Sequence, residues 1–130
     1  MTFIIKNIKW LMLVSGVLTA TMFLGLFAPQ MILESMFAVS FSGTLETLII
    51  RSWSALIGII GLILIYGFFK EDSRVFCISI AAFSKFIFVT LVLIYGQDYL
   101  NKTAGALIMD SLVILMTLCY LISLRISVTK

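Results

Sequence analysis

Residues 75–95, VFCISIAAFSKFIFVTLVLIY, decide the fold of this chain. The run is predominantly apolar, and it reaches the roughly 20 residues that a helix needs to cross the hydrocarbon core of a bilayer. Lys85 lies near its middle. An ammonium group at that depth costs about 2.5–3.5 kcal/mol on insertion scales and is rarely found there without a partner. The stretch therefore predicts a membrane-spanning helix whose buried cation is paired.

Three further runs of similar length and composition accompany this one. The chain has 130 residues, of which 62% are hydrophobic, and a soluble domain of this size cannot bury that much apolar surface. The runs cover residues 10–28, 48–69 and 103–124. Four spans use most of the length, so we expect one transmembrane domain, residues 1–130, folded as an all-α integral membrane four-helix bundle.

The longest connection joins the first two spans. Pro29 predicts the end of the first helix there, because proline cannot continue one. Residues 30–37, QMILESMF, have helical character but are too few to cross a bilayer. We expect them to form a short outer amphipathic segment at the interface, with Glu34 in water. Residues 40–44, SFSGT, are typical of a loop.

Small residues mark the faces on which helices pack closely, because glycine in particular lets a neighbouring backbone approach. Gly16 and Thr19 belong to such a face in the first span. The sequence therefore predicts close helix contacts for the first two spans. In the second span, four residues at steps of three and four share one face: Arg51, Ser54, Gly58 and Gly61.

The basic residues that flank the spans predict the orientation of the chain. Positive residues are enriched on the cytoplasmic side of membrane proteins. We therefore expect a multi-pass protein of a bacterial inner membrane with cytoplasmic N- and C-termini. The same flanks account for the net charge of +3, so we expect no nucleic-acid binding. Arg51 and Lys102 fall on the outer side, and the basic residues on the side of the termini are Lys6, Lys9, Lys70, Arg74, Arg125 and Lys130.

The composition argues against catalysis. The chain has no histidine, which removes the usual general base and most transition-metal and haem ligand sets. Cys77 and Cys119 form no CxxC pair and fall toward the reducing, cytoplasmic side, so we expect neither a disulfide nor thiol–disulfide exchange. We predict no metal site, no cofactor and no enzymatic activity; an enzyme that borrows a cofactor is the last alternative.

Charged residues inside the predicted spans form the candidate site. A helix rises about 1.5 Å per residue, which places Arg51 about 3 Å, Asp110 about 10 Å and Lys85 about 16 Å below the outer edge of the bilayer. Long basic side chains extend along the membrane normal, so we expect both cations to reach the aspartate. The cluster then carries one excess positive charge, unless Glu46 or Glu34 folds over it.

Three interpretations of this cluster stay open. One is a structural ion network that fixes how the second, third and fourth spans pack. Another is a polar pocket open to the outer side and walled by Phe and Met, which suits the anionic or strongly polar head of an amphiphile or a quinone-like molecule. The third is a proton relay, which the single deep carboxylate and the lack of histidine disfavour.

Several of these residues, taken in order, resemble the small four-span bacterial proteins grouped as DoxX-like, which include BphX-like relatives. The first span ends in LFAP (26–29), and the second opens with RSWSALIGIIGLILIY (51–66). SKFIF (84–88) places a cation in the third span, and the acid of the fourth is Asp110. The resemblance implies a four-helix bundle and little about activity. In such relatives the cation of the third span is more often arginine; a lysine there weakens a bidentate contact with an anion.

The function we expect first is that of an accessory or interaction subunit of a larger membrane complex, because the chain is small, has small-residue helix faces and lacks catalytic groups. The alternative is a binder or transporter of an anionic or amphiphilic small molecule. The expected partners are the lipid bilayer, a membrane protein or a second copy of the chain, and such a small molecule. The residues of the candidate site, for ligand binding or for structure, are Arg51, Lys85, Asp110 and Glu46.

Overall fold

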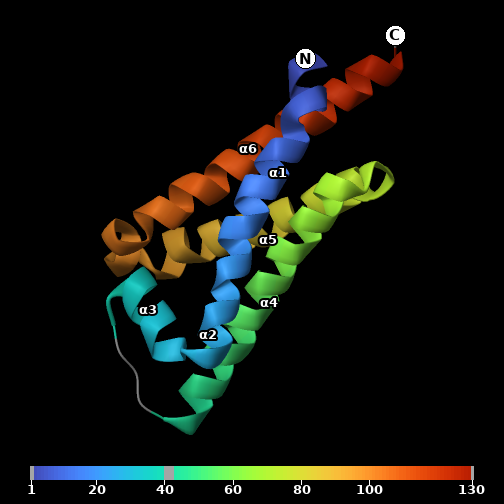
Figure 1. Ribbon diagram of the computed structural model, residues 1–130. Helices are drawn as coiled ribbons and strands as arrows, with labels where there is room; N and C mark the ends of the chain where they lie inside the picture. The colour runs from blue at the N-terminus through green and yellow to red at the C-terminus, as the bar shows by residue number, and fades with distance from the viewer. Residues whose placement is uncertain (1, 40–42, 130) are drawn as a thin grey trace.

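The computed structural model describes residues 2–39 and 43–129, and all secondary structure in these ranges is helical (Figure 1). This confirms the all-α fold with four long helices. Residues 40–42 of the predicted loop, and Lys130 of the basic flank, lie outside the described residues. The elements are α1 (Thr2–Ala20), η1 (Thr21–Phe23), α2 (Leu24–Phe27), α3 (Pro29–Phe37), α4 (Thr44–Phe69), η2 (Glu71–Ser73), α5 (Arg74–Tyr95), η3 (Gln97–Tyr99) and α6 (Leu100–Thr129).

Four helical segments are long and apolar enough to cross a membrane: Phe3–Phe27, Thr44–Phe69, Glu71–Tyr95 and Gln97–Thr129. The length and composition of these four helices confirm the predicted multi-pass architecture. Large apolar side chains such as Phe83 and Ile108 are exposed along these helices, as expected of a surface that faces lipid. The first helix begins at Thr2 rather than near residue 10, because no proline or glycine interrupts its start and Ile8 already packs into the core.

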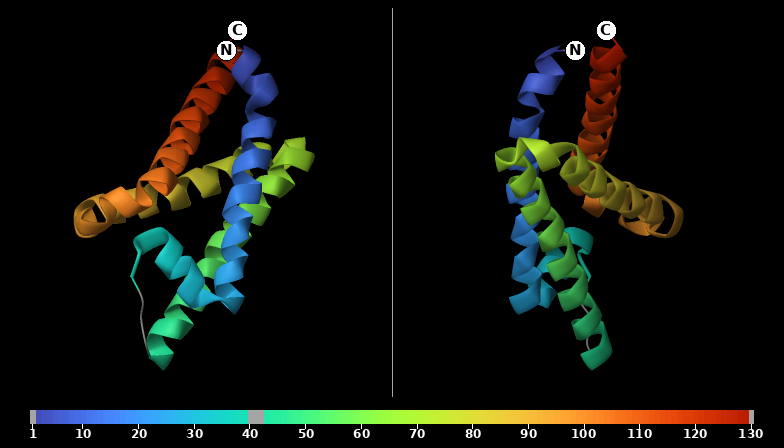
Figure 2. Two further views of the ribbon diagram at one scale, coloured as in Figure 1. Left: turned by 60° about the vertical axis from the view of Figure 1, so that its left-hand side comes forward. Right: turned by 90° about the vertical axis from the view of Figure 1, so that its right-hand side faces the viewer.

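Figure 1 and Figure 2 show how the four long helices are arranged. α1 and α4 lie side by side, and α5 crosses them steeply before α6 returns toward the start of α1. The two termini lie together at one end of the molecule, as an even number of spans requires. The first residues of α4 and α6 lie away from that end.

Glycines let the backbones of α1 and α4 touch. A Cβ atom added to Gly61 would lie 2.7 Å from the carbonyl oxygen of Gly16 and 2.8 Å from Cα of Ala20, which is too close for any side chain. One turn earlier in α4, the ring of Phe23 packs directly on Gly58. The prediction that the glycine face of the second span admits a neighbouring backbone is therefore confirmed.

The cluster of buried apolar side chains that forms the core lies toward the termini. It joins α1, α4, α5 and α6, and Arg74 closes the turn beside it by donating hydrogen bonds to the carbonyl oxygens of Gly67 (3.0 Å) and Phe68 (3.1 Å). These two carbonyls belong to the last turn of α4, where no helical N–H reaches them. The core residues are Ile8, Met12, Leu64, Cys77, Ile78, Ala81 and Tyr120.

The short outer segment predicted before the second span is helix α3. Ala28 leaves the helical conformation (φ −134°, ψ 68°), and Pro29 then starts α3, where its missing N–H costs nothing. Ile32 is buried and Glu34 is exposed, so the segment is amphipathic as expected. Phe37 at its end contacts the rings of Trp53 and Tyr99, with centroids 6.3 Å and 5.6 Å away.

Candidate functional site

A buried ion pair links α5 to α6. The Nζ atom of Lys85 lies 2.8 Å from Oδ1 of Asp110 and donates a hydrogen bond to it. Only 6% of Lys85 and 7% of Asp110 is exposed. The two residues lie on adjacent antiparallel helices, so the partner that the lysine requires comes from the next span of the chain.

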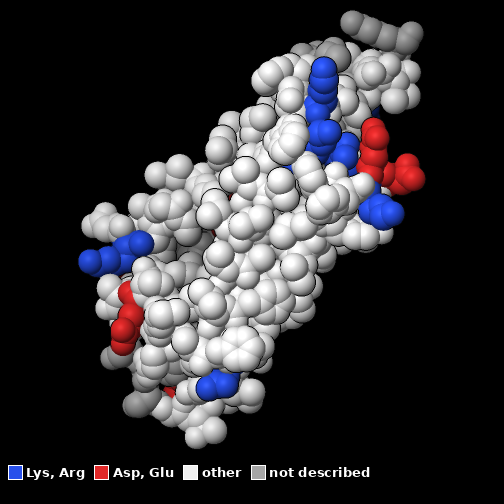
Figure 3. All heavy atoms as spheres, in the orientation of Figure 1, with Lys and Arg blue, Asp and Glu red and all other residues white. Residues whose placement is uncertain are grey.

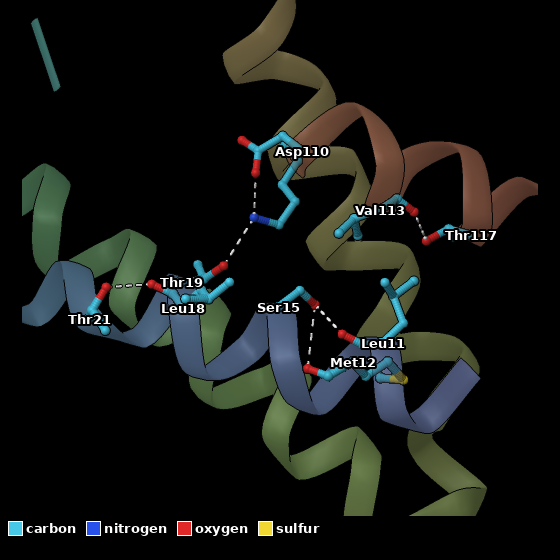
Figure 4. Close-up of polar contacts among 10 residues, drawn as sticks. Leu11, Met12, Ser15, Leu18, Thr19, Thr21, Asp110, Val113 and Thr117 are labelled. Carbon is cyan, nitrogen blue, oxygen red and sulfur yellow. Dashed lines mark hydrogen bonds and ion pairs between the residues drawn. The ribbon is translucent and has the colours of Figure 1, made fainter. Parts of the chain in front are cut away.

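A third residue completes the pair from α1. The Nζ atom of Lys85 also donates to Oγ1 of Thr19 at 3.1 Å, so the ammonium group is held between three helices (Figure 4). The sequence predicts Thr19 only as a packing residue on a face of small residues. Its hydroxyl was the available signal, because a hydroxyl at membrane depth hydrogen-bonds to a polar partner across helices.

The pair has hydrogen-bonding capacity left over. An ammonium group has three N–H donors, and two of those on Lys85 are taken by Thr19 and Asp110. Among the described residues, nothing accepts from the third donor, and nothing donates to Oδ2 of Asp110. One donor and one acceptor therefore remain beside each other.

These side chains line a cavity of about 320 Å³, together with Thr19. Pockets for small molecules commonly have volumes of about 300–1,000 Å³, so this one is at the small end of that range. α1, α3, α4, α5 and α6 all contribute to its wall. Apolar side chains form most of the wall, among them Met22, Met36, Ile57, Ile60, Phe88 and Met109.

The structure does not bring Arg51 and Glu46 to this pair. Both are exposed, neither lines the cavity, and neither forms an ion pair with another described residue. Gly25 packs against Ser54 and α2 ends at Phe27, so α4 continues past its partner and Arg51 is left uncovered. The expected excess of positive charge is therefore absent, and the buried pair has no net charge.

The surface is charged only toward its ends on the face that Figure 3 shows. Lys and Arg, together with Asp and Glu, gather at two opposite ends, and a broad band between them carries neither. A band of this kind is what the hydrocarbon core of a bilayer requires. Lys85 and Asp110 are the charged side chains that are buried among the residues that the structure describes.

Comparisons with protein-family models, with curated proteins and with solved structures find no match to this chain. Within residues 2–39 and 43–129, no three His, Cys, Asp or Glu side chains gather in a group that could hold a metal ion. The chemistry of the site is that of one ion pair, the hydroxyl groups of Thr19 and Ser84, and an otherwise apolar wall. These groups can bind and orient a molecule by hydrogen bonds.

Proposed function

We propose that the protein binds a small amphiphilic molecule within the membrane, with the polar end of the ligand at Lys85 and Asp110. The observation that carries this proposal is that the buried ion pair lines an otherwise apolar cavity. Polar groups of this kind in an apolar pocket fix the orientation of a ligand. Ionisable residues inside membrane proteins commonly mark the path of a substrate or ion.

A purely structural ion pair is a poorer account of the same geometry. Protein interiors are packed about as densely as organic crystals, and a pair that only joins helices gains from close packing on all sides. Here one side of the pair borders a cavity, and one donor and one acceptor have no partner among the described residues. A ligand would supply both the missing volume and the missing hydrogen bonds.

The experiment that tests this function is native mass spectrometry of the protein released gently from its own membranes. We expect an additional mass of small-molecule size on the wild-type chain. It should be lost from the double variant Lys85→Met/Asp110→Leu, which keeps the cavity apolar and uncharged. It should persist in Lys102→Met, because Lys102 is exposed and lies outside the cavity.

Two results would contradict the proposal. A chain without any additional mass, from several growth conditions, would mean that the cavity is not a binding site. An additional mass that survives in the double variant would place the ligand elsewhere. Co-release of other polypeptides would instead support the accessory-subunit function, which stays a prediction.

We further propose that the protein belongs to a bacterial inner membrane and that its two termini face the cytoplasm. The support is the charge distribution, because Lys6, Lys9, Lys70 and Arg74 flank spans on the side of the termini. A C-terminal fusion to green fluorescent protein should then fluoresce, and a fusion to alkaline phosphatase should be inactive. The reverse pair of results would invert the orientation.

Kinship with the DoxX-like proteins is proposed on the residues that carry the resemblance, namely LFAP, the long apolar run after Arg51, and the ionisable pair of the third and fourth spans. An experimental structure determined for a DoxX-like protein should then superpose on all four long helices, with the cation of its third span facing the acid of its fourth. A different order of helices would exclude the kinship.

A further inference from the structure

We infer that the polar end of the ligand is uncharged and carries both a hydrogen-bond donor and an acceptor, as an alcohol, a phenol or a carboxamide does. This inference rests on the proposed function and defines the class of molecule that the site selects. It narrows the anionic or strongly polar head group expected from the sequence to an uncharged one. Charge, hydrogen-bonding capacity and size each support it.

The first argument concerns charge. Lys85 and Asp110 are 2.8 Å apart, and the total charge of the pair is zero whichever of the two residues holds the shared proton. Arg51, which would have made the cluster cationic, is exposed and does not line the cavity. An ionic head would therefore bring an unbalanced charge into an apolar cavity, which is strongly unfavourable.

The second argument concerns hydrogen bonds. The third N–H of Lys85 can still donate to an acceptor, and Oδ2 of Asp110 can still accept from a donor. A hydroxyl group or a primary amide supplies both from one small group. An ether or a ketone supplies only an acceptor, and a quaternary ammonium supplies neither, so each leaves part of the pair unsatisfied.

The third argument concerns size. The cavity of about 320 Å³ is roughly twice the volume of an engineered 150 Å³ cavity that accepts benzene. Met22, Met36 and Met109 line it, and methionine side chains adapt their shape to different apolar groups. A small polar head followed by one ring or one alkyl chain fits this space; a phospholipid head group does not.

The test uses a series of compounds with the same octyl chain and different heads. The full-length protein is placed in bilayers of phosphatidylcholine, and a diazirine-bearing octane without a polar head labels the cavity. Labelled peptides that contain Met22 or Met109 report occupancy. The competitors are octan-1-ol, octanamide, octane-1-sulfonate and octyltrimethylammonium, compared at equal mole fraction in the bilayer.

We expect the alcohol and the amide to displace the label at about tenfold lower mole fraction than either ion. Asp110→Asn leaves a cationic site, and the sulfonate should then become the best competitor. Lys85→Met leaves an anionic site and should favour the ammonium compound. Lys102→Met, the matched control outside the cavity, should keep the wild-type order.

The outcomes separate this inference from the function on which it rests. No labelling of the cavity peptides would overturn the proposed function itself. Labelling that is displaced best by an ion, or equally by all heads, would overturn the uncharged head and leave the binding function standing. If a single variant fails to fold, the double variant Lys85→Met/Asp110→Leu is tested in its place. In this variant the alcohol should bind more weakly and lose its roughly tenfold advantage over the ions. An unchanged advantage would contradict the inference.

Discussion

At the scale of single residues, Lys85 is stable inside the molecule because two groups compensate its charge. Asp110 supplies a full negative charge at 2.8 Å, and the hydroxyl of Thr19 supplies a dipole at 3.1 Å. Removing one partner of a buried pair leaves the other uncompensated, whereas replacing both by apolar residues removes the charges together. The pair should therefore behave as a unit in stability measurements.

Single substitutions of the pair should be far more harmful than the double one. Lys85→Met and Asp110→Leu should each lower the free energy of unfolding by about 3–5 kcal/mol, because each leaves a buried charge unpaired. Lys85→Met/Asp110→Leu should be within about 1 kcal/mol of the wild type. The measurement is reversible unfolding in mixed micelles, with Lys102→Met as the control. Additive effects would mean that the two residues do not interact.

Thr19 should contribute through its hydroxyl and not through its shape. Thr19→Val keeps the volume and removes the acceptor for Lys85, so we expect a loss of about 0.6–1.7 kcal/mol, the range measured for hydrogen bonds between membrane helices. Thr21→Val is the matched control, since Thr21 is exposed and donates only within its own helical segment, to the carbonyl of Leu18. Equal losses in both variants would show that the contact with Lys85 contributes nothing.

At the scale of elements, the contact between α1 and α4 positions the rest of the molecule. Gly16 and Gly61 bring the two backbones together, and this contact fixes where Thr19 lies relative to α5. Rigid contacts between backbones transmit small shifts, because packed interfaces do not deform continuously. A change in this contact should therefore change the position of Thr19 in the candidate site.

Two glycine substitutions separate the effect of this backbone contact on stability from the effect of helix propensity. Gly61→Ala should destabilise the fold by about 1–3 kcal/mol, because its Cβ would collide with the backbone at Gly16 and Ala20. Gly105→Ala should be neutral or stabilising by up to about 1 kcal/mol, since nothing lies within 4 Å of the added Cβ and alanine favours a helix. Thermal unfolding of the two variants side by side checks this. A harmless Gly61→Ala would exclude the close contact.

At the scale of the whole molecule, the buried apolar core and the cavity at Lys85 occupy different parts of the bundle. Toward the termini, Met12, Leu64 and Ile78 are fully buried in the apolar core. Farther along the same helices, the chain leaves a cavity around Lys85 and Asp110. A membrane protein gains little from an empty cavity, because its lining loses dispersion contacts. The apolar core can hold the fold while the cavity binds a ligand.

Filling the cavity should separate stability from binding. Ala106 lines the cavity, and Ala106→Leu should abolish the additional mass in native mass spectrometry while the protein stays as stable as the wild type or more so. Ala104→Leu is the matched control, because Ala104 lies on the same helix and does not line the cavity. Retention of the ligand in Ala106→Leu would contradict the proposed position of the site.

The sequence alone determined the number of long helices and the approximate limits of most of them. Whether a segment such as residues 75–95 crosses a bilayer depends on the transfer of its own side chains into hydrocarbon, and this is a local property. Pro29 likewise acts locally, so the end of the first span and the amphipathic α3 could be predicted. The need of Lys85 for a partner also followed from its own depth.

Only the tertiary structure decided which groups meet. The contact between the backbones of α1 and α4 at Gly61 determines the rotation and crossing of these helices, and residues far apart in the sequence decide it together. This contact brings Thr19 to Lys85 and leaves Arg51 outside, which changes the expected cationic cluster into a neutral pair beside a cavity. The net charge of a site depends on distances between helices, and no pattern within one helix contains them.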